Sequence, residues 1–133
     1  MKKKAFKRTS ELVTKCFTVR QPWAHLIMSG QKDVENRAQR TKYQGRVAVR
    51  VSSTMDASDQ ANVRKYKLNP EKLPRGVVIG TVELYDCVRN SERRCAQPGM
   101  WHWLLKNPRP LKKHKRMKGW LGLFPMKRAI RIG

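Results

Sequence analysis

Three charged residues, Lys32, Glu35 and Arg37, lie close together in the sequence and are the first candidates for chemistry. In an extended segment residues 35 and 37 point to the same face, and a turn before them would bring Lys32 into the same cavity. The cluster can form a structural network of ion pairs. It can instead bind a phosphate or a nucleobase, with Arg37 donating and Glu35 accepting hydrogen bonds. It can also perform acid–base catalysis through Lys32 and Glu35.

Further candidate residues surround this cluster. Trp23 can pack in the core or stack on a base, and hydroxyl groups after the cluster can donate hydrogen bonds beside a pocket. Basic residues follow the cluster and recur near the C-terminus, where KKHKRMKG predicts a basic loop. The candidate nucleic-acid-binding residues are Arg20, Gln21, Trp23, Lys32, Glu35, Arg37, Arg40, Thr41, Lys42, Tyr43, Arg46, Arg50, Ser52, Lys112, Lys113, Lys115, Arg116 and Lys118. Lys32 and Glu35 are catalytic candidates only if the protein is an enzyme.

The net charge narrows the class of partner. The chain of 133 residues has 31 Lys and Arg against 9 Asp and Glu, which gives a net charge of +22. No acidic residue follows Glu92, although basic residues continue to the end of the chain. Self-repulsion at such a charge opposes folding, so a polyanion is the expected partner. Basic patches beside aromatic side chains favour single-stranded or irregular RNA over DNA, and an acidic protein is the alternative partner.

The sequence also suggests a compartment. No run approaches the ~18 consecutive apolar residues of a membrane-spanning helix, and no apolar stretch follows the basic N-terminus as it does in a signal peptide. Cys16, Cys87 and Cys95 are odd in number and lack the spacing of metal ligands, which favours reduced thiols. We therefore expect a cytoplasmic protein, nuclear in a eukaryote, with no metal or other cofactor and no membrane contact. The absence of a heptad pattern predicts a monomer.

The elements that would position these residues follow from the hydrophobic pattern. Alternation predicts strands at 15–20 and 45–52, and apolar residues at helical spacing predict a helix over 22–29. Within 45–52 the valines would face the core, and Arg46 and Arg50 would point the other way. The remaining predicted elements are a short strand at 33–36, a polar helix at 56–67, a central strand at 77–85 with a bulge at Gly80, a strand at 100–105 that NPRP ends, and two short strands or turns after residue 118.

These elements predict an α+β domain. We expect residues 1–14 to form a basic flexible arm. We expect residues 15–133 to form a small β-barrel of five to six strands with two to three short helices.

The stretch CFTVRQPWAHLIMSGQKDVENR, residues 16–37, resembles the start of the activating signal cointegrator homology (ASCH) domain, a member of the PUA-like β-barrel group. That family begins with a strand, an RQPW-like turn into a helix and a G-x-K-x-x-E-x-R motif, which reads here Gly30, Lys32, Glu35 and Arg37. Later segments resemble the family in the same order, namely YQGRVAVRVSS, GVVIGTVELYDCV, WHWLLKNPRPLKK and KGWLGLF. The resemblance covers about residues 15–124.

The resemblance implies a pocket lined by the motif residues and a role in nucleic-acid binding. Some family members resemble ribonucleases, and one branch resembles an amidohydrolase that acts on acetylated cytidine. In that branch a Thr stands where this chain has Glu35, which argues against that activity here. A nucleic-acid-binding module is therefore the expected function. A metal-independent ribonuclease is the main alternative, and the amidohydrolase is the weaker one.

Overall fold

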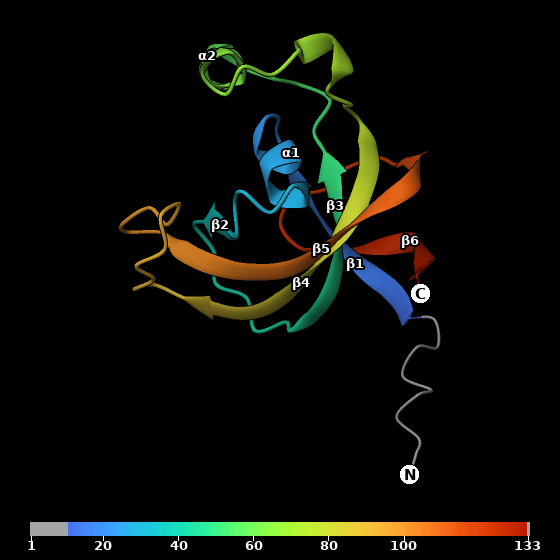
Figure 1. Ribbon diagram of the computed structural model, residues 1–133. Coiled ribbons are helices and arrows are strands. Elements are labelled where there is room, and N and C mark those ends of the chain that lie inside the picture. The colour runs from blue at the N-terminus through green and yellow to red at the C-terminus, as the bar shows by residue number, and fades with distance from the viewer. Residues whose placement is uncertain (1–10, 133) are drawn as a thin grey trace.

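The backbone of residues 11–132, the part of the chain that the computed structural model describes, forms one six-stranded mixed sheet with two short α-helices (Figure 1). The strand order is β2-β5-β4-β3-β1-β6, in which β1 and β3 are parallel and the other neighbours are antiparallel. The predicted α+β class is confirmed. The elements in chain order are β1 (Glu11–Val19), α1 (Trp23–Met28), β2 (Val34–Arg37), β3 (Gly45–Val51), α2 (Ala57–Lys65), the 3-10 helix η2 (Pro70–Lys72), β4 (Val77–Val88), β5 (Trp101–Arg116) and β6 (Phe124–Ile132).

Alternating side chains of β3 contribute to two separate hydrophobic clusters. Val47 and Val49 pack on one face with Ile27 of α1. Ala48 packs on the other face with Phe124 of β6. Because both faces of β3 are covered, Arg46 and Arg50 on the face of Ala48 are buried at 6% and 9% exposure. Their predicted direction is confirmed, but they do not project freely into solvent.

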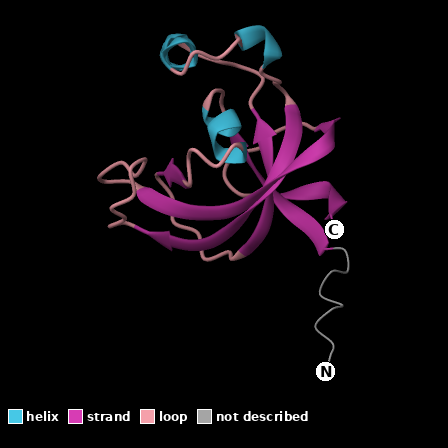
Figure 2. Ribbon diagram, in the orientation of Figure 1, coloured by secondary structure: helices cyan, strands magenta, loops and turns pink. Residues whose placement is uncertain are grey.

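The sheet curls around α1 (Figure 2), whose Ala24 and Ile27 belong to the same hydrophobic cluster as Val47 and Val49. Its edge strand β2 comes close to β1, where the Nη2 atom of Arg37 donates a hydrogen bond of 2.6 Å to the Thr18 carbonyl oxygen. This carbonyl lies on the part of β1 that β6 does not pair with. The contact is a side-chain bridge, since no backbone ladder joins β2 to β1 or to β6 within residues 11–132.

The prediction that NPRP ends the strand starting near residue 100 is wrong. β5 runs without interruption to Arg116, so the segment predicted to be a basic loop is mostly strand. β2 pairs only with residues 101–104, which leaves the rest of β5 as an edge strand, and edge strands accept proline because one side of the backbone has no partner. A register shift opposite Thr81 and Glu83, with Asn107 at a φ of 53°, accommodates the first proline of NPRP.

Other predicted elements agree more closely with the structure. The helices, the short strand β2 and the central position of β4 are confirmed. The bulge at Gly80 is confirmed as well, because the register with β5 slips between Val78 and Gly80. A Cβ atom at Gly80 would lie 2.7 Å from the Arg109 backbone carbonyl oxygen and 2.3 Å from the Met28 Cε atom, so the strand needs glycine between β5 and α1. The end of the chain forms one strand, β6, where two short elements were predicted.

At the N-terminal end, β1 begins at Glu11 rather than at residue 15. The earlier start has a physical reason, since β6 provides antiparallel partners for residues 11–13. Residues 1–10 lie outside the described part of the chain. A basic arm there, and the division between arm and domain, stay predictions.

Candidate nucleic-acid interface

A cleft of about 760 Å³ opens where four distant parts of the chain meet. These parts are the end of β1 with the start of α1, the motif segment through β2, helix α2, and the loop before β5. Because no single segment forms the cleft, its shape depends on the tertiary fold. Its lining residues are Thr18, Val19, Arg20, Trp23, Lys32, Glu35, Asn36, Arg37, Ser58, Asp59, Lys65, Tyr66, Arg94, Cys95, Ala96 and Gln97.

The structure brings Lys32, Glu35 and Arg37 together on the wall of this cleft. One Glu35 carboxylate oxygen lies 3.5 Å from the Lys32 Nζ atom, and the other lies 2.9 Å from the Arg37 Nε atom. Lys32 also donates to the Val34 carbonyl oxygen. The side chains of Lys32 and Glu35 are only 9% and 11% exposed. One carboxylate therefore faces two cations in a largely buried site, which leaves one positive charge in excess.

Arg37 is held in place by more than its ion pair. Its guanidinium carbon lies 5.6 Å from the Phe17 ring centroid and 5.3 Å from the Trp103 ring centroid. Together with its bond to the Thr18 carbonyl, these contacts fix the direction of the guanidinium. A cation positioned in this way needs little further ordering to bind a ligand.

Two aromatic side chains contribute to the wall of the cleft. The Trp23 and Tyr66 rings meet edge to face, with centroids 6.2 Å apart. Trp23 packs against the core and also lines the cleft, so the two roles considered for it are compatible. Tyr66, at the end of α2, is 41% exposed and was not among the candidates from the sequence.

Arg20 positions helix α2 beside the cleft. Its Nε atom lies 2.8 Å from an Asp59 carboxylate oxygen whose side chain is 3% exposed. Asp56 and Asp59 form a reciprocal capping box, in which each side chain accepts the other residue's backbone N–H. The bond from the Asp59 N–H lowers the pKa of Asp56. The Asp-x-x-Asp spacing was a local signal for this helix start, but its pairing with Arg20 has no local signal.

The loop at 94–97 is attached to the motif by Asn36. The Asn36 side chain donates to the Cys95 carbonyl oxygen at 2.9 Å and accepts from the Gln97 backbone N–H at 2.9 Å. His102, 2% exposed, contacts the Gln97 carbonyl oxygen at 2.7 Å. This wall could not be predicted from the sequence, because the two segments are far apart in the chain.

Several candidates from the sequence lie outside the cleft. Gln21 is fully buried, and its amide donates to the Pro74 carbonyl oxygen and accepts from the His25 N–H. The Arg40 guanidinium lies 5.5 Å from the Trp101 ring centroid. The candidates without a place in the cleft lining are Gln21, Arg40, Thr41, Lys42, Tyr43, Arg46, Arg50, Ser52, Lys112, Lys113, Lys115, Arg116 and Lys118.

Arg46 is occupied by protein groups. Its Nη1 atom donates to the Thr81 hydroxyl and to the Asn107 carbonyl oxygen, and Glu11 lies 3.9 Å away. Burial, assisted by nearby Arg109, lowers the pKa of Arg46. These contacts give Arg46 a structural role.

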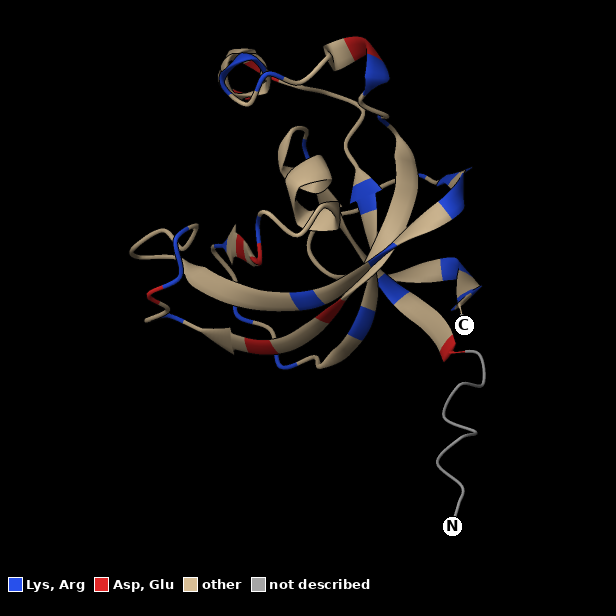
Figure 3. Cartoon of the chain, in the orientation of Figure 1, with Lys and Arg blue, Asp and Glu red and all other residues tan. Residues whose placement is uncertain are grey.

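The basic residues of β5 are exposed along an edge strand. Figure 3 shows that β5 and β6 carry basic residues and no acidic ones, whereas β2 and β4 carry acidic residues. Within residues 11–132 no group of three or more His, Cys, Asp and Glu side chains could hold a metal ion. No helix of that part is long and apolar enough to cross a membrane.

The protein is thus an α+β domain whose curled mixed sheet carries the G-x-K-x-x-E-x-R segment on the wall of a cleft with more basic than acidic residues. The chain belongs to the ASCH family, since the family model described as "ASCH domain" matches residues 17–119. Over 86 residues it is 33% identical to activating signal cointegrator 1 of Homo sapiens and, over the same length, 31% identical to that of Mus musculus. The matches cover 58% of this chain and 15% of each relative, so the chain corresponds to a small part of those proteins.

Proposed function

We propose that this ASCH domain binds single-stranded nucleic acid, RNA in preference to DNA, with one base entering the cleft. The observation that carries the proposal is the combination of a partly exposed aromatic pair with an excess of positive charge in the cleft lining. The lining has five basic residues and two acidic ones, and both acidic side chains are paired with cations. Stacking on aromatic rings and neutralisation of phosphates are the two interactions that hold single strands.

The residues divide into two roles in this proposal. Trp23 and Tyr66 offer ring surface on which a base stacks. Lys65 and Arg94 are exposed and have no ion pair or side-chain hydrogen bond among the described residues, so they are available to contact phosphates. Arg37 and Glu35 would contact the base edge, because a guanidinium donates and a carboxylate accepts.

A single strand fits this arrangement better than a duplex. A base must leave its stack to reach the two rings, and the bases of loops and single strands are already splayed. RNA is favoured because it presents such bases in loops and bulges, and because its 2′-hydroxyl adds a donor and an acceptor.

The contacts of Lys32 support binding over catalysis. Its ammonium group is already engaged by the Val34 carbonyl oxygen and by Glu35. A general base or acid needs an open approach to the reacting proton.

The test is a fluorescence-anisotropy titration of single-stranded RNA, single-stranded DNA, duplex RNA and duplex DNA of equal length at several salt concentrations. Single-stranded RNA should bind most tightly. If about 6–10 phosphates are neutralised, its affinity should fall by about 300-fold to 10⁴-fold between roughly 50 and 200 mM salt, since the slope for single strands is about 0.7 per phosphate. Trp23→Leu should weaken single-strand binding by about 5–150-fold, which corresponds to ~1–3 kcal/mol for one stacked base.

The same mixtures, incubated with EDTA, are then resolved on a denaturing gel. Intact RNA agrees with a binding module. Cleavage that Lys32→Ala abolishes would replace the proposal with a metal-independent ribonuclease. Weak binding of all four ligands without a salt dependence would refute nucleic-acid binding altogether.

A further inference from the structure

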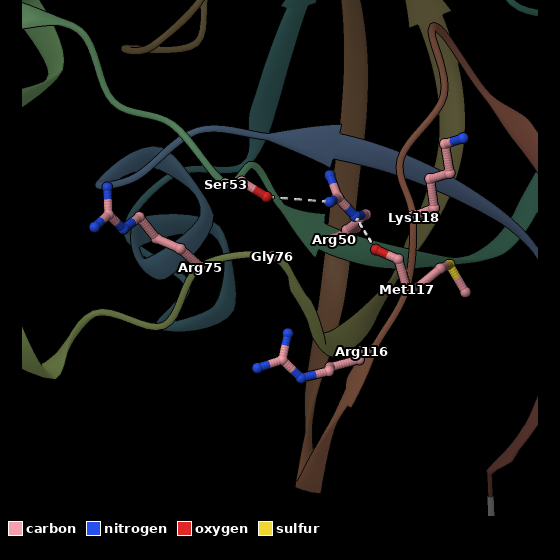
Figure 4. A pocket seen from close by; sticks show the side chains of 7 residues that line it. All are labelled: Arg50, Ser53, Arg75, Gly76, Arg116, Met117 and Lys118. Atoms are coloured by element: carbon pink, nitrogen blue, oxygen red, sulfur yellow. Dashed lines mark hydrogen bonds between the residues drawn. The ribbon is translucent and has the colours of Figure 1, made fainter.

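A second cavity, of about 470 Å³, lies where β3 ends, β4 begins and β5 ends (Figure 4). We call it the Arg50 pocket. Its lining includes Arg50, Arg75, Arg116 and Lys118 and no acidic residue, and it shares no lining residue with the cleft. Four cations without a carboxylate make this cavity different in kind from the cleft, whose acidic residues pair with its cations.

Arg50 is a buried cation without a charged partner. It is 9% exposed, its Nε atom donates to the Met117 carbonyl oxygen, and its Nη2 atom lies 3.5 Å from the Ser53 hydroxyl oxygen. Neither acceptor is charged, and no acidic side chain of residues 11–132 forms an ion pair with it. Arg46, on the same face of β3, has Glu11 at 3.9 Å. Because a buried charge is costly without a counter-charge, an anion bound here would lower the free energy of the folded state.

The Cys16 thiol, which interacts electrostatically with Arg50, does not provide that counter-charge. Cys16 lies on the adjacent strand β1, and burial raises the pKa of its thiol to about 12, although Arg50 acts in the opposite direction. The thiol is therefore neutral at physiological pH. The positive charge of Arg50 stays uncompensated by the protein.

The other cations of the pocket are available to a ligand. Arg75 and Arg116 are exposed, and neither has an ion pair or side-chain hydrogen bond among the described residues. Figure 4 shows the Arg116 guanidinium pointing from the end of β5 toward the side where Gly76 and Arg75 lie, while Arg75 extends outward at the rim. The pocket thus combines the fixed guanidinium of Arg50 with two exposed guanidiniums, those of Arg75 and Arg116, in its lining.

Gly76 keeps the space beside Arg50 open. Its φ of +74° favours glycine, and a Cβ atom there would lie 3.2 Å from the Ser53 hydroxyl oxygen. Its backbone N–H donates to the Val51 carbonyl oxygen at 2.8 Å, which fixes the strand start. The Ser53 hydroxyl, which accepts from Arg50, retains its own proton to donate to a ligand.

We propose that the Arg50 pocket binds a phosphate group, with Arg50 as the fixed cation and with Arg75 and Arg116 as donors that close over it. Guanidinium groups match phosphate oxygens in both charge and geometry. The cavity is larger than one phosphate group, given that a water molecule takes about 30 Å³, so it also admits ester substituents. The expected source is a backbone phosphate of the bound strand. That source rests on the proposed function, whereas phosphate binding itself does not.

The first experiment uses inorganic phosphate as the probe and ¹⁵N-labelled protein at constant ionic strength. Saturable shifts of the Ser53 and Gly76 amide signals are expected, and Arg75→Ala/Arg116→Ala should abolish them without unfolding the protein, since both side chains are exposed. The matched control is Lys127→Ala/Arg128→Ala, which removes two exposed charges from β6 and should leave the shifts unchanged. Shifts that do not saturate, or that both double variants reduce equally, would overturn the site.

The second experiment identifies the source of the phosphate. For single-stranded RNA, Arg75→Ala/Arg116→Ala should reduce the slope of log affinity against log salt by about 0.7 per lost phosphate contact beyond the control variant. Equal slopes for the two double variants, together with a saturable phosphate shift at Gly76 in the unsubstituted protein, would refute a backbone phosphate and assign the pocket to a free phosphate compound. Failure of the cleft proposal has a different signature, because RNA binding would then be insensitive to Trp23→Leu while the phosphate shift at Gly76 stays intact.

Discussion

Glu35→Gln tests whether the carboxylate of the motif holds two buried cations together. Its two oxygens face different partners, at 2.9 Å from Arg37 and 3.5 Å from Lys32, and its side chain is 11% exposed. The glutamine keeps the shape but removes the charge, which leaves two cations facing each other in a poorly solvated wall. Removal of one partner from a buried ion pair costs about 3–5 kcal/mol. We expect about 3 kcal/mol here, the lower end, because Arg37 is 22% exposed and keeps its bond to Thr18.

The assay is urea unfolding, followed by the fluorescence of the tryptophans. A loss of about 3 kcal/mol moves the midpoint down by roughly 1–3 M at the m-values of small proteins. The matched control is Glu83→Gln, because Glu83 lies 4.0 Å from Lys106 in a half-exposed pair, and such pairs contribute about 0–1 kcal/mol. Equal midpoints for the two variants would refute the argument that burial makes the motif pair important to stability.

Further predictions concern the start of helix α2, the bulge in β4 and the buried thiol of Cys16. Asp59→Ala removes the buried partner of Arg20 and half of the capping box, so the free energy of unfolding should fall by about 1–2 kcal/mol. Amide exchange of α2 should accelerate as well, and unchanged exchange would contradict this role. Gly80→Ala puts a Cβ atom 2.3 Å from Met28 and 2.7 Å from a backbone carbonyl oxygen, and a cost below about 1 kcal/mol in urea unfolding would contradict the close approach. Cys16, whose pKa burial raises to about 12, should resist a thiol reagent in the native protein while the other two thiols react, and rapid reaction of all three would contradict its burial. Since that pKa lies above the usual 9.0, the contribution of the neutral thiol to stability should be complete below pH 9.0 and should be lost as the pH rises toward 12.

The local parts of the fold could be predicted because their signals are local. The alternation in β3, the RQPW turn into α1 and the glycine bulge in β4 each depend on neighbours within a few residues. The extent of β5 could not be predicted in this way. Proline is accepted at residues 108 and 110 only because β2 is short and leaves that edge free, and the length of a partner strand is not encoded beside the proline.

For the candidate site, too, only the part formed by residues close together in the sequence could be predicted. The motif predicted that Lys32, Glu35 and Arg37 would share a cavity, and the structure places all three on one wall. The facing walls from α2 and from the loop at 94–97 were missed, because long-range contacts of Arg20 and Asn36 hold them there. Burial of Arg46 and Arg50 likewise depends on how β6 and the end of β5 cover the second face of β3.

In the proposed binding mode the cleft, and not positive charge alone, holds the nucleic acid. The most direct test compares the affinity for single-stranded RNA of Lys65→Ala/Arg94→Ala with that of Lys127→Ala/Arg128→Ala. Both variants lose two exposed charges, but only the first pair lines the cleft. We predict a loss of at least about tenfold for the cleft variant, equal to about 1.4 kcal/mol, and a clearly smaller loss for the β6 variant. Equal losses would contradict binding in the cleft and would leave a basic surface that binds polyanions without a defined site.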